Sequence, residues 1–137
     1  MKRDNWITLY NIYRSNDGEI TEYNRSVIRV HMEEYDGAVE KGSADKSADT
    51  ISFFAPFTIE KETGKKFVEP EEYLRLTNRT GFFTFRKGDI VLKGKVDEDI
   101  ASEKEFVLAH PDMVRVRGCT GNNFGSPAMR HWEVYCD

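Results

Sequence analysis

The chain has 137 residues, which is enough for one domain with a single core and too few for two separate cores. Its composition, 39% hydrophobic and 12% aromatic, supplies the apolar area of such a core without a metal or a disulfide. The 20 Lys and Arg residues against 24 Asp and Glu give a net charge of -4, which disfavours a dedicated binder of nucleic acid or membrane surfaces. No apolar run has the length of a spanning helix or the form of an export signal, so we expect a soluble, cytoplasmic protein.

The first predicted element is a hairpin with two long arms. Residues from Trp6 to Tyr13 are aromatic and β-branched, and Ser15-Asn16-Asp17-Gly18 is a turn sequence. The second arm, from about Ile20 to Met32, alternates in period two, with apolar residues on both faces towards its end. We therefore expect this end to be covered on both sides.

A long loop is predicted between Asp36 and Asp49. This segment holds small and charged residues and has no sustained apolar period. Loops of this length without secondary structure are usually functional or disordered. We expect a mobile loop over 36–49, and both a tolerated insertion and a partner-binding arm remain open for it.

The middle of the chain predicts short elements separated by turns. Proline and acidic residues at the start of 69–76 favour a helix N-terminus. In chain order, we expect a strand from Thr50 that stops at Pro56, a charged surface excursion over 60–66, a helix over 69–76, a strand from Ile90 to Val96 and a helix over 102–108.

The tail predicts a second antiparallel hairpin with one apolar face. Apolar and polar residues alternate over 114–117 and again over 131–136, as in half-buried strands. Trp132 and Val134 therefore share a side with the valines of the first arm and should pack in the core. Together the elements predict a mainly β fold over residues 1–137: a single small β-barrel or sandwich of antiparallel hairpins with one or two short helices.

The two cysteines are predicted to be reduced. If the tail hairpin turns near Gly125, Cys136 lies opposite Val114 and Cys119 opposite His131, about 17 Å apart along the strands. This separation is too long for a disulfide.

No pattern in the sequence carries catalytic or metal chemistry. The serines lie outside any Gly-x-Ser-x-Gly elbow, and there is no phosphate-binding loop. The histidines and cysteines lack the close paired spacing of zinc ligands. The acidic runs Glu33-Glu34 and Asp97-Glu98-Asp99 could hold a cation, but such runs next to turns are typically solvated. We expect no enzymatic activity, no cofactor and no metal.

One segment combines aromatic and basic residues. Phe82, Phe83 and Phe85 precede Arg86-Lys87, a combination found on surfaces that stack single-stranded nucleic acid. Alternating aromatics on a strand are more often core residues. A standalone β-barrel module that binds single-stranded nucleic acid or an oligosaccharide is therefore the alternative function.

Three segments resemble small structural proteins of prophages. The tail from Val114 to Val134 has an Asn, then Gly-Ser, then His-Trp and a closing strand. The opening has Ile7-Thr8-Leu9-Tyr10-Asn11 followed by Tyr23-Asn24-Arg25-Ser26-Val27-Ile28, and the middle has Gly88-Asp89-Ile90-Val91-Leu92-Lys93-Gly94. These segments are similar to minor capsid proteins of phages of Gram-positive bacteria, of the head-closure or head–tail connector type.

The resemblance implies a non-enzymatic virion protein. In such proteins a small β-barrel or sandwich forms a ring beneath the portal and carries loops towards the channel and the tail. It implies portal or adaptor and tail proteins as partners, without a membrane or sequence-specific nucleic acid, although DNA passes through the ring. The expected location is the host cytoplasm during assembly and then the virion; the isolated subunit can be monomeric.

Residues of opposite charge are the predicted contacts between subunits. Arg115 and Arg117 would form an exposed basic face. It would meet acids such as Glu33, Glu34 and Asp97 to Asp99 of the next subunit, head to tail. The long loop would add small and charged contact residues, namely Gly42, Ser43, Asp45 and Lys46.

Overall fold

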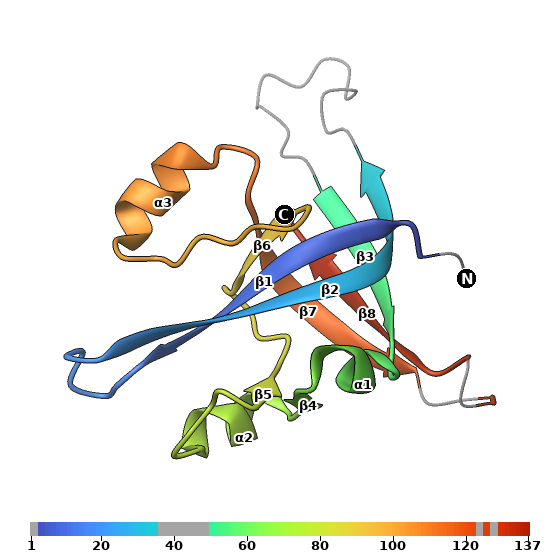
Figure 1. Cartoon of the computed structure of the whole chain (residues 1–137), viewed down its shortest axis with the longest axis horizontal. Helices are drawn as coiled ribbons and strands as arrows, with labels where there is room; N and C mark the ends of the chain where they lie inside the picture. Colours follow the sequence, from blue (N-terminus) through green and yellow to red (C-terminus); the bar gives the residue numbers. More distant parts are fainter. Residues whose placement is uncertain (1–2, 36–49, 123–124, 127–128) are drawn as a thin grey trace.

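Six antiparallel strands close into a ring (Figure 1). The computed structural model describes residues 3–35, 50–122, 125–126 and 129–137. Around the ring the order is β1-β2-β3-β8-β7-β6, a closed barrel. Its strands are β1 (Asn5–Arg14), β2 (Thr21–Tyr35), β3 (Thr50–Pro56), β6 (Ile90–Lys93), β7 (Val114–Asn122) and β8 (His131–Cys136). The expected mainly β fold of antiparallel hairpins is confirmed. The predicted loop over 36–49 lies outside the described residues.

The first hairpin is confirmed and extends beyond the closed sheet. β1 pairs with β2 along its whole length, from Asn5 opposite Val30 to Arg14 opposite Thr21. The turn between them needs Gly18, whose φ of 74° favours glycine. β6 and β3 pair with only part of β1 and β2, so the distal half of the hairpin has no further strand beside it. Figure 1 shows this half projecting away from the ring.

An excursion of short elements connects β3 to β6. It contains α1 (Ile59–Thr63), β4 (Lys66–Phe67), α2 (Pro70–Arg75) and β5 (Phe82–Phe83). The predicted helix over 69–76 is confirmed as α2. The segment over 60–66 lies at the surface as expected, but it begins within α1, which a buried Ile59 anchors and Gly64 ends.

The core has two parts, one inside the ring and one outside it. The predicted helix over 102–108 is confirmed as α3 (Glu103–Ala109), with Ser102 as its N-cap. Phe106 of α3 packs with Tyr10 and Ile90 on the outer side of β1 and β6. Because β1 faces the inner core on one side and this second cluster on the other, residues 7–12 are all buried.

The tail hairpin has the predicted faces but a different register. Trp132 and Val134 lie in the inner core with Val114 and Val116, as expected. However, Cys136 lies opposite Val116 and not Val114.

Two local features shift this register. A β-bulge between Val116 and Gly118 adds one residue to β7, and the strands pair as far as Asn122 opposite His131, so the turn is centred later than Gly125. Cys119 lies opposite Val134, which makes it a diagonal neighbour of Cys136, and the predicted 17 Å separation is wrong. Both thiols are free.

Candidate interaction surface

Arg115 does not form an exposed basic face, contrary to expectation. Its guanidinium donates to the carbonyl oxygen of Gly88 at 2.9 Å and to Oε2 of Glu103 at 3.2 Å. The period-two pattern correctly predicts that Arg115 points away from the inner core. However, α3 packs over that outer side of the sheet and supplies Glu103 as its partner. Arg115 therefore connects β7 to α3 and is not available to a neighbouring subunit.

Arg117 remains a surface cation. It lies in the bulge of β7, and its side chain is 59% exposed. Its Nη1 lies 3.4 Å from Oδ1 of Asp137, a contact between two solvated groups that stabilises the fold little. An intermolecular contact of Arg115 would have to break its bonds to Gly88 and Glu103. Arg117 can make such a contact without that loss.

Glu33 and Glu34 lie at the end of β2 and have different surroundings. Oε1 of Glu34 lies 2.5 Å from Nζ of Lys93, whereas Glu33 is exposed opposite Ser52. The register continues from Ser52 to Tyr135 and then to Gly118, next to Arg117. Glu33 and Arg117 therefore lie along one row of the same sheet, and the structure does not place them on opposite sides of the subunit. Gly42, Ser43, Asp45 and Lys46 lie outside the described residues.

A second set of surface acids follows β6. The side chains of Asp97 and Asp99 are 101% and 96% exposed, and both carboxylates lie within 3.1 Å of the Arg25 guanidinium. These acids follow the C-terminal end of β6, whereas Arg117 follows the part of β7 that pairs with the N-terminal end of β6.

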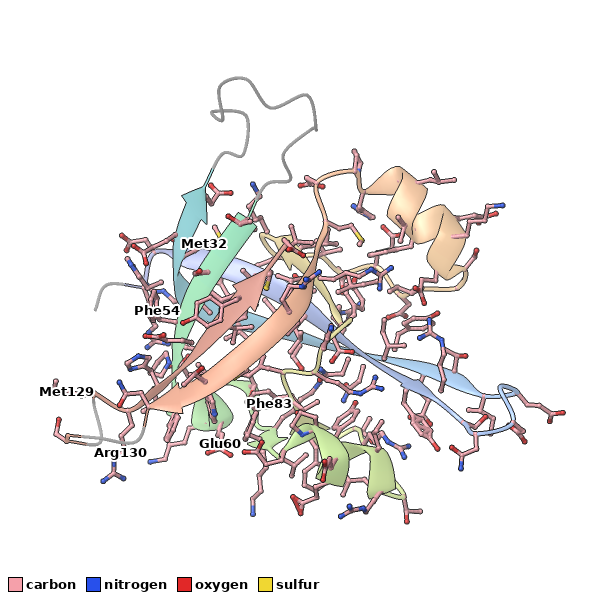
Figure 2. The ribbon with its side chains drawn as sticks, turned by 180° about the vertical axis from the view of Figure 1, so that it is seen from behind. Met32, Phe54, Glu60, Phe83, Met129 and Arg130 are labelled. Carbon is pink, nitrogen blue, oxygen red and sulfur yellow. The ribbon has the colours of Figure 1, made fainter. Side chains whose placement is uncertain are left out.

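An aromatic row on the outer side of the sheet was not predicted. The ring of Phe54 lies 5.6 Å from that of His31 and 5.7 Å from that of His131, between centroids. Figure 2 shows Phe54 on the strand pair that β3 makes with β8. Tyr135, 44% exposed, lies on the same side of the sheet. The alternation around Phe54 indicates that this ring lies on the outer face of its strand. The sequence does not indicate that β2 and β8 are the neighbours of that strand.

Two of the three rings of the predicted stacking platform, those of Phe83 and Phe85, are buried, and Phe82 is half-buried. Phe83 and Phe85 are 0% and 3% exposed, and their rings lie 5.9 and 5.8 Å from that of Trp132. Phe57 and Phe67 complete this aromatic cluster beneath the closed sheet. These rings stabilise the core and are not available to bases or sugars.

Two cations, the buried Arg79 and the half-buried Lys65, hold the excursion against the hairpin. Nζ of Lys65 donates to the side chains of Asn24 and Ser26 and to the carbonyl oxygen of Arg25, at 2.6 to 2.9 Å. Burial lowers the pKa of Lys65. The Arg79 guanidinium lies 3.4 Å above the ring of Tyr13. Nothing in the sequence around either residue distinguishes it from an ordinary surface cation, so neither was predicted.

One buried acid also escaped prediction. Asp89 is 1% exposed, and burial raises the pKa of its carboxyl group to about 6, although hydrogen bonds from Asn11 and Ile12 oppose this shift. Among the described residues, no group of three or more His, Cys, Asp and Glu side chains is arranged to hold a metal ion. None of the helices in the described ranges is long and apolar enough to cross a membrane.

Comparison with known families gives one match, which covers nearly the whole chain. The sequence profile of the "Family of unknown function (DUF6751)" matches residues 2–137. The chain belongs to this family. The DUF6751 match includes every strand of the ring, the excursion and α3. No curated protein and no solved structure matches the chain.

Proposed function

We propose that the protein is a non-enzymatic structural subunit of the neck of a tailed phage or prophage, of the head-closure or head–tail connector type. It assembles into a ring in the host cytoplasm, contacts portal or adaptor and tail proteins, and remains in the virion. One observation carries the proposal. The three segments that resemble minor capsid proteins fall on β1, β2, β6, β7 and β8, five of the six strands of the closed sheet.

The excursion shows the opposite pattern. Its segment from Asn78 to Phe85, which contains β5, does not match those proteins, and it lies outside the closed sheet. A resemblance that follows the strands of the sheet and omits an inserted segment is what a shared scaffold would give, because insertions are tolerated between such strands. This distribution supports the proposal.

Exposed apolar side chains also support a subunit that contacts neighbours. Ile20 at the end of the hairpin is 57% exposed, Leu108 on α3 is 74% exposed, and Tyr135 on β8 is 44% exposed. They lie on three different parts of the molecule, as they would in a subunit with neighbours on several sides.

The contact between subunits is proposed to be electrostatic in part. Arg117 of one subunit meets Asp97 and Asp99 of the next, which is a head-to-tail contact and can close into a ring. Because these groups are exposed, salt screens their attraction over about one Debye length. Association of the isolated protein should therefore weaken as the salt concentration rises.

Deletion of the gene from an inducible lysogen tests the proposed role. The expected result is DNA-filled heads and free tails that do not join, seen by electron microscopy after induction. A plasmid copy of the wild-type gene should restore joined particles. If the deletion strain still releases joined, infectious particles, the neck function is wrong.

Sedimentation velocity tests the contact itself. At low salt, the average mass of the sedimenting wild-type species should increase with protein concentration. Arg117→Glu should abolish this increase. Arg75→Glu is the matched control, because Arg75 is 78% exposed on α2, away from the proposed contact. Equal behaviour of the two variants would contradict the role of Arg117.

A further inference from the structure

Part of β7 has a strand partner on one side only. β6 pairs with β7 opposite Val114 and Arg115, and the next contacts are the hydrogen bonds of Val116 with Gly88 and Asp89. From Gly118 to Asn122, β8 is the only strand that pairs with β7 in the described part of the chain. Within the described ranges, no strand pairs with the second edge of this segment.

The pairing of β8 shows which backbone groups face the open edge. The carbonyl oxygen of Arg130 accepts from the N–H of Phe57 next to β3, so His131 and Glu133 direct their backbone groups to β7. Thr120 and Asn122, which lie opposite these two residues, use their backbone groups in the β7–β8 ladder.

Cys119 and Gly121 alternate with those residues, so their N–H and C=O groups point away from β8. No hydrogen bond from the other described residues reaches these groups. A row of free donors and acceptors at this spacing is what an added strand pairs with.

A hollow of about 210 Å³ lies beside this edge. Its apolar lining includes the buried rings of Phe85 and Trp132 and the half-buried ring of Phe67. Cys119 and Gly121 of β7 also line it. A strand placed along β7 would therefore have a pocket for one of its side chains.

Gly121 keeps the hollow open. Its φ is not positive, so the backbone does not require glycine there. A Cβ at this position would meet only Cδ1 of Trp132, at 3.8 Å, which is ordinary van der Waals contact. The fold would therefore accept a side chain at position 121, and glycine leaves this space empty.

The rim of the hollow is acidic. Of the described residues that line it, Glu69 alone is charged, and Glu69 is exposed. Glu71 and Glu72 follow in the first turn of α2 and are also exposed. A cationic side chain at the rim would therefore be attracted, and an anionic one repelled.

We propose that the Cys119–Gly121 edge of β7 binds an extended, basic peptide segment of a partner protein by strand addition. The main chain of the peptide pairs with Cys119 and Gly121, an aliphatic side chain enters the hollow, and a Lys or Arg lies against Glu69. This binding does not depend on the virion role, because it follows from the open edge and the hollow alone.

Selection from a random seven-residue peptide library tests the proposal. Wild-type protein should enrich peptides with an aliphatic residue next to Lys or Arg. Gly121→Val, which fills the hollow, should bind the selected peptides at least tenfold more weakly. Gly118→Val is the matched control, because a Cβ there meets nothing within 4 Å and lies outside the hollow. Its affinity should stay within twofold of wild type.

Two further measurements keep the test decisive if Gly121→Val does not fold. Glu69→Lys changes an exposed residue and should shift the selected peptides from basic to acidic. Amide exchange of the wild-type complex should slow at Cys119 and Gly121. Selection of the same peptides by Glu69→Lys, protection elsewhere in the chain, or no enriched peptide class would each overturn the proposal.

Discussion

The side-chain amide of Asn11 donates a hydrogen bond of 2.7 Å to Oδ2 of Asp89, and both residues are buried. The same amide donates to the carbonyl oxygen of Thr84, and the N–H of Ile12 donates to Oδ1 of Asp89 at 3.1 Å. These bonds connect β1 to the turn that precedes β6. The carboxyl group of Asp89 thus holds the start of β6 against β1, although the two strands are distant in sequence.

Burial of Asp89 makes the stability of the protein depend on pH. The carboxyl pKa rises from 3.8 to about 6 on folding, so the folded state binds the proton more tightly than the unfolded state. The resulting stabilisation is complete below about pH 4 and is lost as the pH rises through 6. The loss amounts to roughly 3 kcal/mol of unfolding free energy.

Urea unfolding between pH 3.5 and 7.5 measures this effect. Wild type should lose stability across the range, and Asp89→Asn should remove most of the slope, because the amide does not ionise. Asp112→Asn, at an exposed acid, is the control and should keep the wild-type slope. Parallel pH profiles for wild type and Asp89→Asn would show that Asp89 is not the group responsible.

Trp132 should be a major source of stability. It is 6% exposed, and its ring lies 4.3 Å from that of Phe57 and 4.6 Å from that of Phe67. Trp132→Ala should lower the unfolding free energy by roughly 3–5 kcal/mol. Trp6→Ala should cost about 1 kcal/mol, because Trp6 is 37% exposed and its ring lies 4.1 Å from Nζ of Lys95. Chemical unfolding of both variants checks this, and equal losses would mean that Trp132 is not a core residue.

Arg79 should hold α2 against the first hairpin. Its guanidinium donates to the carbonyl oxygens of Tyr73 and Leu74 at 2.9 and 3.0 Å, while it lies over the ring of Tyr13. Arg79→Ala should cost roughly 2–3 kcal/mol, and Arg79→Lys should recover only part of it, since an ammonium group lacks the planar fork.

Amide exchange locates the effect of the Arg79 variants. Exchange should accelerate first in α2 (Pro70–Arg75) and leave α3 unchanged. Arg75→Ala is the control, because that side chain is 78% exposed. Uniform acceleration throughout the chain would indicate global destabilisation and not loss of a local contact.

The two cysteines should be unreactive in the folded protein. Burial raises the pKa of the Cys119 thiol and of the Cys136 thiol to about 12, so almost no thiolate is present at neutral pH. Ellman's reagent should modify neither thiol at pH 7.5 until urea unfolds the chain. Rapid labelling of the native protein would contradict the burial of Cys136 and the partial burial of Cys119.

The hairpins and their faces were predictable from the sequence, because the signals are local. The turn around Gly18 and the alternation in the tail need only neighbouring residues, and the structure confirms both. The helix starts at Pro70 and Ser102 were predictable for the same reason, since capping preferences act within one turn.

Closure of the sheet decided which side chains are buried and which residues are neighbours, and local sequence patterns did not determine this. Whether Arg115 is free depends on α3, and whether Phe83 is a surface or a core residue depends on Trp132, about fifty positions later in the chain. The bulge after Val116 changed the register of the cysteines, although the alternation looked regular. The burial of Asp89 likewise follows from Asn11 on another strand. Period-two patterns fix which side of a strand faces inward, but only long-range strand pairing fixes which residues meet there.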